Sequence, residues 1–135
     1  MAIINTFQKC LESPYLFEDK DASARIGDLL AKAGDRLEAA VNIQTSGQGD
    51  PADAVFLSYE AMFCCLRALV YAKGYREFGL RCLLLACENL YVKTGQLDPD
   101  HLRKFELAQR MKLSAAEAVA SASGFVKRTL ELLGQ

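Results

Sequence analysis

Residues 53–73 are apolar almost throughout, and their pattern predicts one helix that is buried on nearly all sides. Apolar side chains recur there with the period of an α-helix along two neighbouring stripes, so a helix in this segment must be covered from several directions. The first stripe consists of Val55, Tyr59, Met62, Phe63, Leu66 and Val70, and the second of Leu57, Ala61, Cys64, Ala68 and Tyr71. The rest of the chain is therefore expected to fold around this segment.

The charged residues of the same segment share one narrow strip of the predicted helix. Asp53, Glu60 and Arg67 are spaced seven residues apart, which places them on one side of an α-helix. The simpler interpretation is that the central helix meets solvent along this strip. The alternative interpretation is that the strip lines a ligand site.

Composition limits the class of protein. A chain of 135 residues with 51% hydrophobic residues fits one domain with an ordinary core, and we expect a single domain over residues 1–135. The net charge of −1 provides no overall attraction to nucleic acid or anionic membranes. No uninterrupted apolar run reaches the ~20 residues that span a bilayer, and residues 1–10 lack the features of a signal peptide. We therefore expect a cytoplasmic protein.

The cysteines and the single histidine indicate no metal or cofactor site. The five cysteines, at 10, 64, 65, 82 and 87, contain no C-x-x-C pair, and we expect all of them to be reduced and packed as small apolar groups. Cys82 follows Arg81, but three leucines come directly after it, which favours a packing role. His101 has no second histidine to complete a Cys/His zinc site, and we expect it to be exposed in the first turn of a helix.

The remaining segments predict an all-α fold. Helical spacing of apolar residues predicts a short helix at about 3–11 followed by a connector to residue 20, and further helices at 22–44 and 77–94. Asp50-Pro51 and Asp98-Pro99 are typical helix starts, and the Ser114–Glu117 spacing is that of a capping box. No segment shows the alternation of a strand. We therefore predict an antiparallel up-and-down bundle of four or five helices over residues 22–134.

Three runs of the central segment also carry a family resemblance. They read Tyr59-Glu60-Ala61-Met62-Phe63, then Arg67-Ala68-Leu69, then Tyr71-Ala72-Lys73-Gly74. This order resembles the YYAMF...ARALL...KG signature of HEPN domains, and the similarity extends over residues 24–133. The resemblance implies a helical bundle that commonly dimerises and is often encoded with a minimal nucleotidyltransferase as a toxin–antitoxin-like pair. It also raises RNA cleavage and nucleotide binding as activities.

The sequence departs from HEPN ribonucleases where their chemistry would lie. Those enzymes carry an Arg-x4-6-His pair, whereas the positions upstream of His101 at that spacing, 94–96, hold Thr, Gly and Gln. Arg110 lies where the family often has its arginine, and it is followed at that spacing by Ala115, Ala116 and Glu117. Only Glu117, after a large rise of its pKa, could transfer a proton near neutral pH. We therefore do not expect ribonuclease activity by this route.

Two functions from different classes follow. The first is a non-catalytic interaction module that forms a homodimer and binds a minimal nucleotidyltransferase, which the surplus of apolar residues in segments 53–73 and 77–94 supports. The second is nucleotide or RNA binding in a polar groove that contains Glu60, Arg67 and Arg110, with Arg76 and Arg81 near its rim. The second function requires these five side chains to converge in space.

Overall fold

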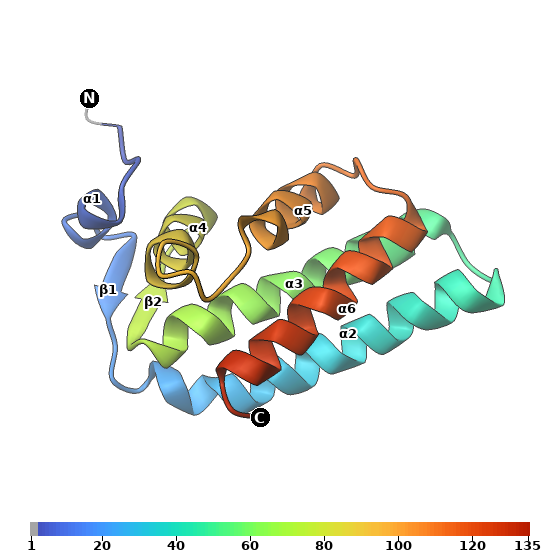
Figure 1. The fold of residues 1–135 in the computed structure, drawn as a ribbon, viewed down its shortest axis with the longest axis horizontal. Helices are drawn as coiled ribbons and strands as arrows, with labels where there is room; N and C mark the ends of the chain where they lie inside the picture. The colour runs from blue at the N-terminus through green and yellow to red at the C-terminus, as the bar shows by residue number, and fades with distance from the viewer. Residues whose placement is uncertain (1–2) are drawn as a thin grey trace.

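The computed structural model describes residues 3–135 and confirms the predicted helical bundle (Figure 1). Within these residues the chain is mostly helical, with one small sheet. The helices are α1 (Phe7–Leu11), α2 (Ile26–Ser46), α3 (Pro51–Ala72), α4 (Leu80–Cys87), α5 (Pro99–Gln109) and α6 (Ala115–Leu132). A 3₁₀ turn, η1 (Ala22–Arg25), leads into α2, and a π-helical turn, η2 (Glu88–Val92), continues α4.

Helix α3 is the centre of the core, as its two apolar stripes predict. It packs most extensively against α2 and α6, which run beside it in Figure 1. Met62, Leu66 and Leu69 are fully buried on α3, and Phe105 of α5 and Phe125 of α6 close over them. Contrary to our expectation for the chain, α3 is long and apolar enough to cross a membrane. Since most of it is buried inside the bundle, it has the character of a core helix of a globular domain.

The predicted helix starts are confirmed. The Asp50 side chain accepts a hydrogen bond from the backbone N–H of Ala52, and Asp98 does the same for Asp100. At α6 the capping box is complete, because the Ser114 hydroxyl accepts from the Glu117 N–H and the Glu117 carboxylate accepts from the Ser114 N–H. Each cap satisfies backbone donors that have no partner inside the helix.

The expectation that the chain has no strand is wrong. Strands β1 (Leu16–Glu18) and β2 (Tyr75–Glu77) form a two-stranded antiparallel sheet, in which Phe17 lies opposite Arg76. β1 lies inside the predicted connector, and β2 occupies the predicted start of the helix at 77–94, which begins only at Leu80. Strands of three residues are too short to show a period-2 pattern, so their pairing depends on tertiary contacts.

The expectation of five reduced cysteines is also wrong. Cys10 of α1 and Cys82 of α4 form a disulfide, with Cα atoms 5.7 Å apart. The other three cysteines, Cys64, Cys65 and Cys87, are free and buried, as expected for packing residues. Burial raises the pKa of the Cys65 and Cys87 thiols to about 12, which keeps them protonated and unreactive. The disulfide attaches the N-terminal segment to the bundle.

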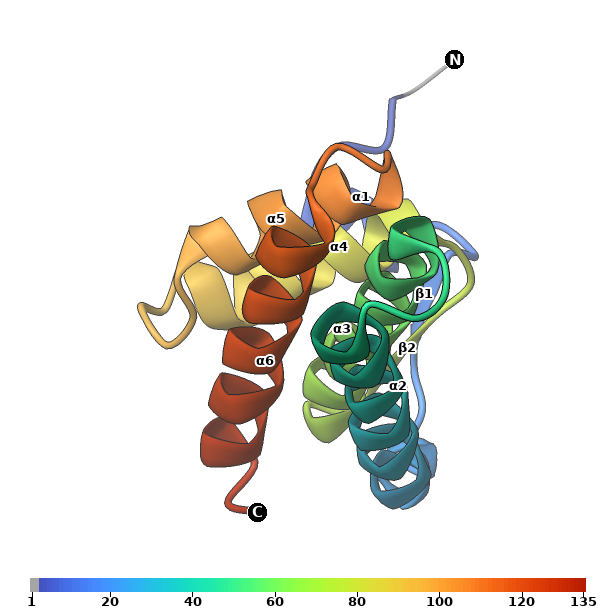
Figure 2. The ribbon, with the colours of Figure 1, turned by 90° about the vertical axis from the view of Figure 1, so that its right-hand side faces the viewer.

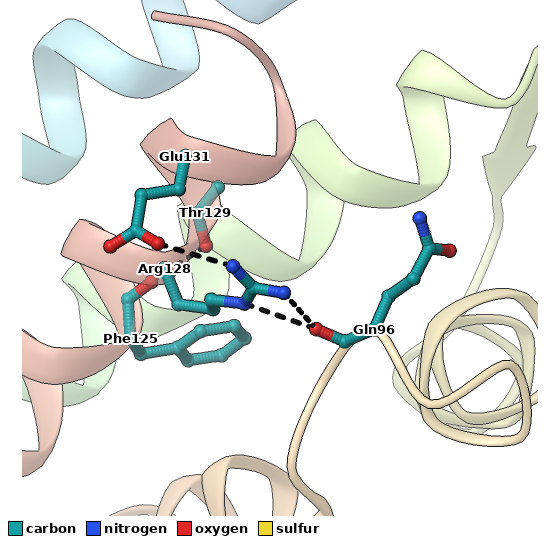
Figure 3. A network of polar contacts seen from close by, with 5 residues as sticks. All are labelled: Gln96, Phe125, Arg128, Thr129 and Glu131. Carbon is teal, nitrogen blue, oxygen red and sulfur yellow. Dashed lines mark hydrogen bonds and ion pairs between the residues drawn. The ribbon is translucent and has the colours of Figure 1, made fainter.

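Helices α4 and α5 cross the direction of α6. In Figure 2, α4 and α5 lie beside each other and run across the direction of α6. In Figure 1, α4 is seen nearly end-on, whereas α3 is seen lengthwise across the picture. The loop that leads from η2 to α5 is held by Arg128 of α6 (Figure 3). The Arg128 guanidinium donates to the Gln96 carbonyl oxygen from Nε at 3.0 Å and from Nη2 at 2.8 Å, and from Nη1 to Glu131 at 3.1 Å. One side chain therefore fixes the 93–98 connection onto α6.

Candidate ligand groove between α2 and α3

The charged strip of α3 borders a cavity of about 250 Å³ beside α2. Helical phase places Glu60 and Arg67 two turns apart on one side of α3, and α2 presents Lys32 from the opposite wall. The lining residues are Lys32, Phe56, Tyr59, Glu60, Phe63, Cys64 and Arg67. We call this cavity and its continuation the α2–α3 groove.

An aromatic cluster forms one side of the groove. The Tyr59 ring stacks on Phe105 with centroids 5.1 Å apart, and Phe63 meets both rings edge-on at 5.8 and 5.9 Å. Phe56 continues the cluster outward, where 52% of its surface is exposed. The Arg67 guanidinium lies 4.4 Å above the Phe63 ring centre, a cation–π contact that holds its charge against the groove.

A second cavity of about 320 Å³ continues the groove toward β2, and it shares Lys32 and Arg67 with the first. It adds two cations, Arg25 and Arg76, and two carboxylates, Asp28 and Glu77. The rest of its lining is Leu29 and Tyr71. Four cations thus face three carboxylates across the two cavities, when Glu60 of the first is included. The groove is polar, with a small excess of positive charge.

Glu77 is the most buried charge of the groove, with 5% of its side chain exposed. It accepts from Arg67 Nε at 3.1 Å and from the Tyr71 hydroxyl at 2.7 Å. Burial, followed by the hydrogen bond and the charge of Glu77, raises the pKa of Tyr71. These contacts fix the direction of Arg67, since a buried carboxylate is stable only when it is paired.

The structure brings together three of the five residues that the sequence indicated. Glu60 and Arg67 line the first cavity, and Arg67 and Arg76 the second. Glu60 pairs with Arg36 at 3.4 Å, and Arg76 with Asp19 at 3.7 Å. The ligand role of these residues stays a prediction.

The other two predicted residues lie elsewhere. Arg81 lies on α4 and donates from Nε to the Ile4 carbonyl oxygen at 2.6 Å. Arg110, at the end of α5, lines a different cavity together with Glu88 and Glu106. Neither arginine lines either cavity of the α2–α3 groove.

Sequence reasoning missed the contribution of α2 to the groove. No site role was predicted from the sequence for Arg25 or Lys32, although Lys32 lines both cavities and Arg25 lines one. The available signal was the seven-residue spacing from Arg25 to Lys32, which matches that from Glu60 to Arg67. That spacing alone does not say which side of α2 meets α3.

The two candidate proton-transfer groups, His101 and Glu117, are engaged in structural contacts. His101 is half-buried rather than exposed, because its ring stacks on Phe125 with centroids 5.1 Å apart. Burial lowers the pKa of His101, against the opposing influence of Asp98 and Asp100. Hydrogen bonds from Ser114 lower the pKa of Glu117, opposite to the rise that a proton donor would need at neutral pH.

The comparison with protein families identifies the fold. The family model of the HEPN domain matches residues 26–127, which include α2 to α5 and most of α6. The chain belongs to the HEPN domain family. Comparison with curated proteins and with solved structures gives no significant match. HEPN domains often pair with nucleotidyltransferases.

The HEPN match also divides the chain into two parts. The α2–α3 groove lies within the matched residues except for Arg25, which directly precedes them. α1, β1 and η1 come before the match. The disulfide and the β1–β2 pairing attach this N-terminal segment to the HEPN bundle.

Proposed function

We propose that this HEPN domain is a non-catalytic interaction module, which forms a homodimer through one face of its small sheet and pairs with a minimal nucleotidyltransferase. The observation that carries the homodimer is a group of exposed large apolar side chains near β1 and β2. Three of the six such residues in the described chain lie in β1 or directly beside one of the two strands: Tyr15, Phe17 and Phe78. We call them the apolar sheet face.

Local structure explains why these side chains point outward. Along β1, Leu16 is buried against the bundle, so its neighbours Tyr15 and Phe17 lie on the other side of the strand. Phe78 follows β2 and donates its backbone N–H to the Tyr15 carbonyl oxygen at 2.9 Å. This hydrogen bond holds the backbones of the two residues side by side. Phe78 is 74% exposed. Clustered exposed aromatic residues favour a protein-binding surface.

Light scattering after gel filtration tests the homodimer. The wild-type chain should be a dimer at micromolar concentration, and Phe17→Glu and Phe78→Glu should each be monomeric, because each substitution places a carboxylate in an apolar interface. Phe56→Glu is the matched control, since Phe56 is exposed to a similar degree on α3, and it should stay dimeric. A monomeric wild type would refute this assembly.

The nucleotidyltransferase pairing has a separate test. HEPN domains often pair with such proteins, and a minimal nucleotidyltransferase gene beside this one would identify the candidate partner. Co-expression of the two chains should then give a complex that survives gel filtration at moderate salt. Two chains that elute separately at micromolar concentration would count against the toxin–antitoxin-like pair.

The α2–α3 groove supports a second function, binding of a nucleotide or of RNA. Lys32 and Arg67 provide charge for a phosphate, and Phe56 and Tyr59 provide aromatic faces beside them on which a base can stack. Calorimetric titration with nucleotides and short RNA should give binding that Lys32→Ala weakens by about tenfold. Lys20→Ala, at an exposed position outside the groove, should have no effect.

The absence of catalysis is tested directly with RNA. Purified protein should leave single-stranded and structured RNA intact at neutral pH, and Arg110→Ala should change nothing, because an arginine stays protonated and cannot act as a general base. Residual cleavage that persists through stringent purification, and disappears in both Arg110→Ala and Glu117→Gln, would overturn this conclusion.

A further inference from the structure

The Cys10–Cys82 disulfide lies directly beside the apolar sheet face. Cys10 comes shortly before Tyr15, and Cys82 comes shortly after Phe78, so the bond joins the segments that flank the two strands. Because the strands are antiparallel, the start of β1 and the end of β2 lie at the same end of the sheet, and the disulfide is found at this end. Figure 1 shows α1, both strands and α4 together at one end of the bundle.

A set of hydrogen bonds leads from the disulfide to the apolar sheet face. The Ser13 hydroxyl donates to the Cys10 carbonyl oxygen at 2.7 Å and accepts from the Tyr15 N–H at 3.1 Å. The Tyr15 carbonyl oxygen in turn accepts from the Phe78 N–H at 2.9 Å. The backbone position of Cys10 therefore bears directly on the positions of two aromatic residues of this face.

A cavity of about 270 Å³ also connects the disulfide to these residues. Its lining consists of Ile4, Tyr15, Phe78, Gly79, Leu80, Arg81 and Cys82. Tyr15 and Phe78 are exposed, so the cavity lies at the surface of the molecule. Cys10, by contrast, is fully buried. A small thiol in solution therefore reaches the bond from the side of Cys82.

The pairing of β1 with β2 is weak without the disulfide. Each strand has three residues, and a two-stranded sheet of this size is marginally stable in water by itself. The strands are also far apart in the chain, so their pairing carries the entropy cost of closing a long loop. The disulfide offsets this cost, because it keeps the Cα atoms of Cys10 and Cys82 5.7 Å apart. The oxidised chain thus holds Tyr15 and Phe17 firmly beside Phe78.

We propose that the Cys10–Cys82 disulfide is a redox switch of the homodimer. The oxidised form holds the apolar sheet face in the arrangement that a second copy of the chain binds, and reduction by a dithiol weakens the dimer. This inference rests on the proposed homodimer, whose interface is that face. It does not depend on the nucleotidyltransferase or on a ligand of the α2–α3 groove.

Reduction proceeds by two thiol–disulfide exchanges with the dithiol. Its first thiolate attacks the Cys82 sulfur, which forms a mixed disulfide and expels Cys10 as a thiolate. Its second thiolate then attacks the dithiol sulfur of the mixed disulfide and expels Cys82. The two expelled thiolates take up the two protons that the dithiol has lost. Two electrons thus pass to the cysteine pair, and the dithiol becomes a cyclic disulfide; a low-molecular-weight disulfide reverses the reaction by the same exchanges.

The other cysteines do not compete for this bond. Cys64, Cys65 and Cys87 are free and buried. Burial raises the pKa of the Cys65 and Cys87 thiols to about 12, and it also raises the pKa of Cys64. Protonated thiols are poor nucleophiles, so the disulfide does not move to another cysteine pair in the folded chain.

The expected effect of reduction is a dimer that is about tenfold weaker. Both copies must present an ordered face, so the dissociation constant rises with the inverse square of the fraction of chains in which the face is ordered. An ordered fraction of about one third in the reduced chain gives the tenfold change. The bundle itself stays folded, since α3 packs most extensively against α2 and α6, none of which carries the bond.

Sedimentation velocity over a series of concentrations tests the proposal. The dissociation constant of the wild-type dimer should rise about tenfold when dithiothreitol reduces the disulfide, and oxidised glutathione should restore it. Cys10→Ser combined with Cys82→Ser is the control variant. It should have the weaker dissociation constant with and without dithiothreitol, which shows that the three free cysteines are not responsible.

Hydrogen exchange provides a readout that is independent of the dimer. In the monomeric variant Phe78→Glu, reduction should speed the amide exchange of β1 and β2 and leave that of the buried helix α3 unchanged. Strand amides that exchange at the same rate in both redox states would overturn the switch.

The outcomes separate the switch from the homodimer. A monomeric oxidised wild type would overturn both. Equal dissociation constants of the oxidised and reduced wild type would overturn the switch and leave the homodimer standing. Loss of the helical circular dichroism signal on reduction would also overturn the switch, because the dimer would then be lost through unfolding of the bundle.

Discussion

Removal of the Cys10–Cys82 disulfide should lower the free energy of unfolding by about 4 kcal/mol. The two cysteines are 72 residues apart, so the bond closes a loop over more than half of the chain. In the chain-entropy description, closing a loop of that size lowers the conformational entropy of the unfolded chain by about 15 cal/mol/K. Near 25 °C this corresponds to about 4 kcal/mol of stabilisation. Small domains are stable by only about 5–15 kcal/mol, so the loss would be a large share of the total.

The rest of the N-terminal segment should stay near the bundle after the bond is removed. Its other contacts are the β1–β2 pairing, the hydrogen bond from Arg81 to the Ile4 carbonyl oxygen, and the edge-on contact of Phe7 with Tyr75 at 5.5 Å. These contacts are local and partly exposed, so each contributes little by itself. We therefore expect a folded but less stable protein, in which α1 exchanges its amide hydrogens faster.

Urea denaturation with and without dithiothreitol measures the effect. The wild-type chain should lose about 4 kcal/mol when dithiothreitol reduces the disulfide. The double variant Cys10→Ala/Cys82→Ala should be insensitive to dithiothreitol, which controls for reactions of the three free cysteines. Thiol titration of the unfolded, unreduced chain should find three thiols. Five thiols, or an unchanged free energy after reduction, would refute the reasoning.

Three further predictions concern single residues. Ser58→Ala should raise the free energy of unfolding by about 1 kcal/mol in urea denaturation, because the Ser58 hydroxyl is buried without a hydrogen-bond partner. Arg128→Ala should lower it by about 1–2 kcal/mol through loss of the paired hydrogen bonds to Gln96, whereas Arg103→Ala, which breaks an exposed ion pair, should cost less than about 0.5 kcal/mol. Burial lowers the pKa of His101, so the imidazole binds a proton more readily in the unfolded chain than in the folded one. The free energy of unfolding should therefore fall as the pH drops below about 6.5. His101→Gln should flatten this pH dependence in thermal melts at several pH values.

Helix positions could be predicted where the signal is local. Asp50, Asp98 and Ser114 each act on a backbone N–H two or three residues away, so a short stretch of sequence contains the whole interaction. Gly74 could be assigned in the same way, because its φ of 84° after α3 is one that glycine adopts readily. The burial of α3 follows from its composition, since a helix that is apolar on most sides has to be central.

Contacts between distant segments could not be predicted in this way. β1 and β2 are short strands far apart in the chain, and Cys10 meets Cys82 only because that sheet and α4 hold α1 in place. An odd number of cysteines without a C-x-x-C pair was weak evidence against a disulfide, because it says nothing about distance in the fold. The cytoplasmic location stays a prediction. The disulfide counts against it, since disulfides are rare in a reducing compartment.

The candidate site shows the same limit within a few turns of helix. Glu60 and Arg67 could be placed together because both lie on α3, where the helical period fixes their relative direction. Arg76 and Arg81 are close in sequence, yet β2 and α4 carry them apart, one into the α2–α3 groove and the other to the Ile4 carbonyl oxygen. Lys32 lines the groove only because of the way α2 packs on α3. That arrangement depends on side-chain packing along the whole interface between the two helices. A sequence read one helix at a time thus identifies the charged strip, whereas the residues that complete it depend on the packing of the bundle.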